Sequence, residues 1–168
     1  MPTKTKRKPA ARKKPAKSAA PSAEAKKLHR QALRANWDDG LWLLGRIVAN
    51  PACDHGTALA IYWMGAPGFD QQYANAKAVD SWRKPTFTFL RKLETRLLGK
   101  KFKTAAILFN PRFDRTTVSS TGHDWTAEYG DIAVRRAIPD ALKEPSCLDP
   151  AWEKRGREPI ANTANRLT

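Results

Sequence analysis

The sequence predicts a mainly α-helical protein: a compact small helical module, with room for one short β-hairpin, preceded by a disordered basic tail. Apolar residues recur at spacings of three and four in several stretches, which is the period of a helix. Asn, Asp, Ser, Pro and Gly bracket these stretches as starts and stops. Charge is divided unevenly, because residues 1–35 hold 12 Lys and Arg and one acid, out of 31 and 16 in all 168 residues. We therefore expect a tail over residues 1–21, an α-rich globular domain over 22–145 and a polar, loosely ordered segment over 146–168.

The tail contains no Val, Ile, Leu, Phe, Trp or Tyr, so nothing in it can offset the entropy lost on ordering the backbone. We predict that it is disordered. A cationic strip on a flexible chain attracts phosphate backbones by releasing counterions, without reading their sequence. A merely solubilising extension is the competing interpretation. The cations that would contact a polyanion are Lys4, Lys6, Arg7, Lys8, Arg12, Lys13, Lys14 and Lys17.

Two helices are predicted at the start of the domain. Ser22 can cap a weakly amphipathic helix over residues 23–35. Asn36 is a candidate N-cap for the next helix. The helix dipole favours a negative charge such as Asp39 in the first turn, and Asn50, which precedes a proline, is expected to end the helix. The apolar stripe of this second helix is Trp37, Leu41, Leu44 and Val48.

Two further helices are clearer still. Asp54 is the candidate N-cap of a helix that ends at Gly65 and is apolar nearly all round, so it should be central. Pro85 suits the first turn of a helix over 85–98. Its outer face would carry Lys92, Arg96 and Lys100 at i, i+4 and i+8, a second contact for a polyanion.

The remaining stretches give weaker patterns. Residues 67–82 hint at one more helical stripe through Tyr73, Ala76 and Val79. Residues 102–109 suit a strand or an extended segment, and its hairpin partner could be 116–120. A short helix over 132–136 and a turn over 141–143 complete the expected elements. Tryptophans within helices are expected in the core rather than as platforms for base stacking, because they fall on apolar stripes.

The motifs Asn-Trp-Asp-Asp-Gly at 36–40 and Cys-Asp-x-Gly-Thr-Ala-Leu at 53–59 together resemble a bacterial family catalogued as a domain of unknown function, numbered DUF4274. The similarity covers roughly residues 30–100. The resemblance implies a small, mainly helical intracellular module and no established activity.

Chemistry-bearing residues are sparse, and we expect no catalytic residue, metal or cofactor. Asp38 and Asp39 are neighbours on a helix, so they do not face one site, and capping accounts for them. Cys53 and His55 flank Asp54 at a helix start, a position that can activate a thiol, so a Cys-dependent enzyme is one alternative. No zinc-ligand spacing joins the two cysteines and three histidines.

Export signals and membrane spans are also missing, which favours a cytoplasmic address. The function expected from the sequence is a non-catalytic intracellular binding module whose tail contacts nucleic acid or another polyanion and whose body contacts an unknown protein partner. The main alternative is a protein-partner module, such as one that neutralises a toxin or effector.

Overall fold

The computed structural model describes residues 20–117 and 122–147, and in these ranges the protein is helical, as the sequence predicts. Apart from one isolated antiparallel bridge between Asp114 and His123, no β pairing occurs in them. None of the helices in the described ranges is long and apolar enough to cross a membrane. The four α-helices are α1 (Ala23–Leu33), α2 (Trp42–Ala49), α3 (His55–Met64) and α4 (Lys84–Leu98), and three 3-10 turns are η1 (Trp37–Asp39), η2 (Phe69–Gln72) and η3 (Asp140–Leu142).

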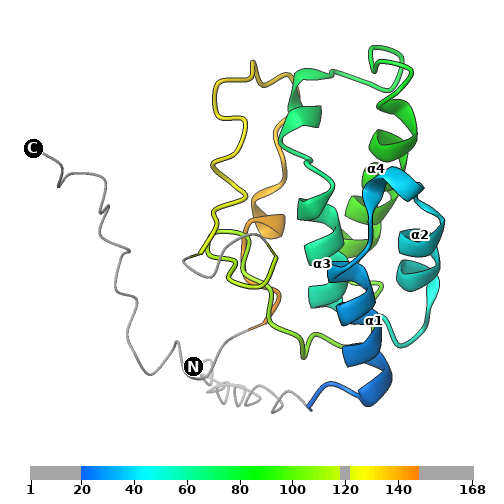
Figure 1. Cartoon of the computed structure of the whole chain (residues 1–168). Helices are drawn as coiled ribbons and strands as arrows, with labels where there is room; N and C mark the ends of the chain where they lie inside the picture. Colours follow the sequence, from blue (N-terminus) through cyan, green and yellow to red (C-terminus); the bar gives the residue numbers. More distant parts are fainter. Residues whose placement is uncertain (1–19, 118–121, 148–168) are drawn as a thin grey trace, which may run out of the picture.

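Helix α3 occupies the centre because nearly its whole surface is apolar. Eight of its ten residues, from Gly56 to Trp63, are buried. It packs between α1 and α4, and α2 packs against α1 (Figure 1). The Trp63 indole donates a hydrogen bond to the Leu142 carbonyl at 2.8 Å, so η3 closes the core from the C-terminal side. Each fully buried large apolar side chain contributes about 2–3 kcal/mol.

The second predicted helix is interrupted, which corrects the single stripe from Trp37 to Val48. The Asn36 side chain accepts from the Asp38 amide at 3.1 Å, but the turn that it caps is η1. Gly40 follows with φ +86°, a conformation that glycine adopts readily and that breaks a helix. The α-helix resumes only at Trp42.

The predicted hairpin is wrong in the residues that the structure describes. Residues 102–109 form no strand; they cross the start of α3, where the amides of Ala106 and Ile107 donate to the Asp54 carboxylate. In the suggested partner, Thr116 and Thr117 bond to Asp114, and residues 118–120 lie outside the described ranges.

Two weaker helix expectations are also wrong. Residues 73–79 form turns beyond η2, with Ala76 exposed, so the suggested stripe does not exist. Residues 132–136 are not helical, because the amides of Arg135 and Arg136 donate to the Gln71 carbonyl of η2 instead of to their own segment. The turn expected at 141–143 is present as η3. The tail and most of the C-terminal segment, residues 1–19 and 148–168, lie outside the described residues.

Candidate functional site

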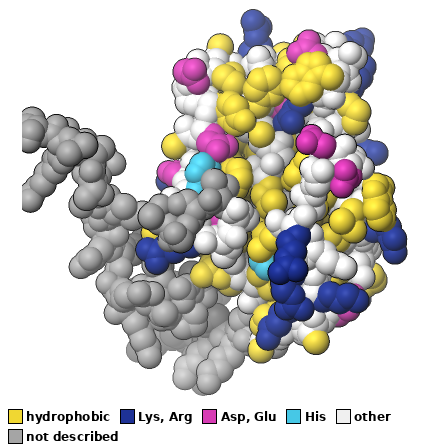
Figure 2. All heavy atoms as spheres, in the orientation of Figure 1, with side chains coloured by type: hydrophobic (Ala, Val, Ile, Leu, Met, Phe, Trp, Pro, Cys, Tyr) yellow, Lys and Arg dark blue, Asp and Glu magenta, His cyan; other side chains and the backbone are white. Residues whose placement is uncertain are grey.

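One end of the helical bundle gathers cations from segments far apart in the sequence. The chain enters this end at Ala20, and α4 delivers the chain to it at Gly99 (Figure 1). A run of Lys and Arg side chains is visible low on the face drawn in Figure 2. None of the cations named next forms an ion pair within the described part of the chain. We call them the basic end: Lys26, Lys27, Arg96, Lys100, Lys101 and Lys103.

The predicted stripe along α4 is only partly formed. Lys92 is exposed and Arg96 half-buried on the helix, but α4 ends at Leu98. Lys100 lies past Gly99 with φ +50°, in the left-handed region, so it leaves the helix face on which a spacing of eight would place it. The three cations therefore lie on a helix and its following turn, and the eight tail cations from Lys4 to Lys17 are outside the described residues.

Asp54 fixes the segment that carries the last of these lysines. Its fully buried carboxylate accepts from the Gly56 amide at 2.9 Å, as an N-cap of α3. The same carboxylate accepts from the amides of Ala106 at 2.8 Å and Ile107 at 3.1 Å. The His55 amide donates to the Thr104 carbonyl at 2.8 Å. A residue expected only to cap a helix thus also ties residues 104–107 across its start.

Close packing reinforces this attachment. Gly56 lies so near the crossing segment that a Cβ on it would stand 1.9 Å from the Ile107 carbonyl oxygen. Ser146 donates its hydroxyl to that carbonyl at 2.8 Å and accepts from the Phe109 amide at 2.8 Å. The crossing segment is therefore held from both sides.

Arg96 is placed by an aromatic contact rather than by an acid. Its guanidinium carbon lies 4.8 Å from the ring centroid of Phe102, whose other neighbour is the ring of His55 at 6.1 Å. A guanidinium over a ring keeps its charge without being neutralised. Arg96 therefore contributes a fixed, unneutralised positive charge to the basic end.

The Cys53–Asp54–His55 cluster does not have the properties of a nucleophile. Burial raises the pKa of the Cys53 thiol to about 12, whereas an activated cysteine has a lowered pKa. The Asp54 carboxylate is occupied by three backbone amides. His123, which could serve as a further proton acceptor, lies instead 2.8 Å from Glu128 and against the ring of Trp125. No group of three or more metal-binding side chains occurs in the residues described.

The neighbouring acids Asp38 and Asp39 are both exposed on η1. Asp39 accepts from the Asn36 side-chain amide at 3.1 Å, so it braces the capping residue rather than capping a helix itself. Nothing in this arrangement brings the two carboxylates to a common site.

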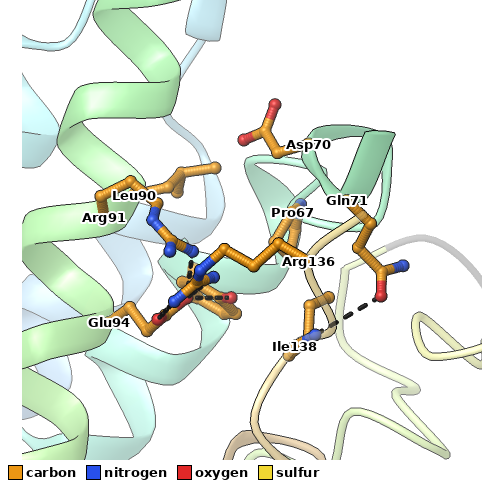
Figure 3. A pocket seen from close by; sticks show the side chains of 9 residues that line it. Pro67, Asp70, Gln71, Leu90, Arg91, Glu94, Arg136 and Ile138 are labelled. Carbon is orange, nitrogen blue, oxygen red and sulfur yellow. Dashed lines mark hydrogen bonds and ion pairs between the residues drawn. The ribbon is translucent and has the colours of Figure 1, made fainter. Parts of the chain in front are cut away.

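A small cavity lies beside α4, between that helix and the segments that carry Pro67, Gln71 and Ile138 (Figure 3). The buried Glu94 carboxylate accepts from Tyr62 Oη at 3.0 Å, from Arg91 Nη1 at 2.9 Å and from Arg136 Nη2 at 2.6 Å. About 10 Å³ is open to the centre of a water molecule, room for one water. Burial raises the pKa of Glu94, and Arg91 and the Tyr62 hydrogen bond oppose that shift. The Glu94 carboxylate is thus held by three donors, and its ion pair with Arg136 fastens the segment of Arg136 onto α4.

Sequence reasoning missed the side chains that join distant segments. Arg136 reaches Glu94 across 42 residues, and Arg83 pairs with buried Asp70 at 2.7 Å. The one sequence signal for Glu94 is that an acid falls on the apolar stripe of its helix. Its partner Arg136 lies in a segment without apolar periodicity, so the sequence does not indicate the pair. Trp42 was also unexpected, because it lies on helix α2 yet is 61% exposed.

Comparison with known proteins supports the family suggested by the two motifs. Residues 23–98 match the family model described as Domain of unknown function (DUF4274), which confirms the resemblance over the four helices. No curated protein matches the chain significantly. No solved structure does so either.

Proposed function

We propose that this protein is a non-catalytic intracellular module that binds nucleic acid, or a comparable polyanion, through its cationic tail and the basic end of its body. The observation that carries the proposal is that the tail joins the body at the basic end. The eight tail cations precede Ala20, where the chain enters the same end of the bundle that displays Lys100, Lys101 and Lys103. A phosphate backbone held by one would lie within reach of the other.

The support for this function is electrostatic and does not involve a sequence-specific DNA- or RNA-binding motif. The cations of the basic end form no ion pairs among the described residues, so contact with phosphate does not require an internal pair to break. Counterion release then supplies affinity without base contacts. The raised thiol pKa of Cys53 weighs against a Cys-dependent enzyme as the alternative.

The salt dependence of binding tests the tail. If about five tail cations engage phosphates, log affinity for duplex DNA should fall with log salt at a slope of about −4 to −5. Deleting residues 1–21 should flatten that slope and weaken binding. Affinity that is independent of salt, or unchanged by the deletion, would refute the role of the tail.

A matched pair of variants tests the body. Lys101→Gln/Lys103→Gln removes two charges from the basic end, and Lys77→Gln/Lys84→Gln removes two exposed charges from the other end of α4 and its preceding turn. The first should reduce the salt slope by about two units and the second should leave it nearly unchanged. Equal effects would mean that only net charge matters. Capture of one acidic protein by the body, with no nucleic-acid binding, would favour the protein-partner alternative.

A further inference from the structure

Two tryptophans are the most exposed large apolar side chains of the described residues, Trp42 at 61% and Trp82 at 68%. Their surroundings differ. The Trp82 ring lies 6.0 Å from the Phe69 ring, in the turn that also holds the exposed acid Asp80. Trp42 is on the outer face of α2, and the guanidinium carbon of Arg46 lies 5.8 Å from its ring centroid. Of these two indoles, only Trp42 has a guanidinium against its ring among the described residues; the acids nearest to it in sequence, Asp38 and Asp39, lie on η1.

The surface beside Trp42 is open at Gly45. Gly45, three residues on, has no heavy atom within 4 Å of where its Cβ would stand, apart from its own helix. Arg46 is exposed and forms no ion pair within the described ranges. A planar ligand could therefore lie on the indole while an anionic group meets the guanidinium.

Charge continues from this face onto the neighbouring helix. Helix α1 packs beside α2 (Figure 1), and its exposed Lys27 and Arg30, with Arg34 at its C-cap, form no ion pairs with described residues. Lys27 also belongs to the basic end, and Arg30 lies in the last turn of α1. The cations thus run from the entry of the tail, along α1, toward Arg46 on α2.

An exposed indole beside an arginine, at the end of a cationic track, has the chemistry that unpaired bases recognise. Bases stack on aromatic rings and guanidinium planes, while their phosphates follow the cations. Bases within a duplex are stacked on one another and do not offer their faces. The two ligand forms therefore make different use of Trp42.

We propose that Trp42 and Arg46 form a stacking site for unpaired bases, so that the nucleic acid preferred by this protein is single-stranded. This inference rests on the proposed function and names its ligand class. The tail supplies capture by charge, and α2 distinguishes a single strand from a duplex.

Fluorescence anisotropy with labelled oligothymidine of about 20 nucleotides, and with a duplex of similar length, tests the site. Trp42→Ala should weaken binding of the single strand by roughly fivefold to a hundredfold and leave duplex binding within about twofold. Trp42→Phe should retain most of the affinity. Trp82→Ala removes a comparably exposed ring whose printed contact is with Phe69, and it should change neither affinity. In a Trp82→Phe background, oligothymidine should quench tryptophan fluorescence and the duplex should not.

The outcomes separate the two proposals. If single strand and duplex both bind with salt-dependent affinity and Trp42→Ala changes neither, the stacking site is refuted and the proposed function stands. If neither ligand binds the natural protein at low salt, both fail. Circular dichroism of each variant checks the fold, and Arg46→Gln, which should weaken the single strand more than Lys77→Gln does, provides a second test that leaves the indole in place.

Discussion

Replacing Gly56 with alanine would place a methyl group against the carbonyl of Ile107. The added Cβ would stand 1.9 Å from that oxygen and 2.9 Å from its carbon, whereas real Cβ atoms essentially never approach closer than 3.0 Å. The obstacle is backbone, so it cannot rotate away. The crossing segment must retreat by about 1 Å, which strains the bonds from the Asp54 carboxylate to the amides of Ala106 and Ile107.

The expected cost follows from these contacts. Overpacking costs about 1–3 kcal/mol, and a hydrogen bond to a charged group is worth about 1.5–3 kcal/mol. Weakening one such bond as well gives a total loss of about 3–5 kcal/mol in the free energy of unfolding. The melting temperature should fall by roughly 10–20 °C, as measured by circular dichroism.

Gly45→Ala is the matched control, because Gly45 also lies within a helix but has open space where Gly56 has none. It should stabilise the protein by about 0.5–1 kcal/mol, since alanine restricts the unfolded chain. A Gly56→Ala protein that unfolds at the same urea concentration as the natural one would refute the close approach of the Ile107 segment and with it the placement of Lys103.

Three further results are expected. Iodoacetamide should modify Cys53 only after unfolding, because burial raises the pKa of its thiol to about 12. Mass spectrometry of the folded protein labelled at neutral pH tests this, and an alkylated Cys53 peptide would contradict it. Arg136→Ala should cost about 1–3 kcal/mol of unfolding free energy in urea, because it removes a partner of buried Glu94, whereas Arg112→Ala, which breaks an exposed pair at 3.5 Å, should cost less than about 1 kcal/mol. Burial lowers the pKa of His29 below its ordinary 6.5, so the unfolded chain binds the proton more readily and the free energy of unfolding should fall as the pH drops below about 6.5. In urea titrations His29→Gln should flatten that dependence on pH, and an unchanged profile would exclude His29 as its source.

Helix boundaries were predictable because the signals for them are local. Ser22 accepts from the Ala25 amide and Asp54 from the Gly56 amide, so the capping residues act within a few positions of themselves. Pro85 lies in the first turn of α4 for the same kind of reason. Gly40 shows where such prediction fails, because the spacing of apolar residues does not reveal that a glycine has a positive φ and interrupts the helix.

The segments after α4 could not be assigned because their partners are distant. Residues 102–109 have the composition of a strand, but their hydrogen bonds go to Asp54 and Ser146. The amide of Arg136 and its side chain likewise bond to Gln71 and Glu94, on other elements. Among the basic residues, the sequence indicated Lys92 and Arg96, but the turn that diverts Lys100 depends on its left-handed backbone.

The hydrogen bond from the Trp63 indole to the Leu142 carbonyl bears on which part of the chain can be expressed as a stable fragment. The match to the family model ends at residue 98, yet Phe109, Ile138 and Leu142 complete the same apolar interior as α3. A polypeptide stopped after Leu98 would leave one flank of its central helix uncovered and its indole donor facing water or another molecule. Such a fragment should self-associate during purification, and a shortened form intended for crystallisation should extend at least through Ser146.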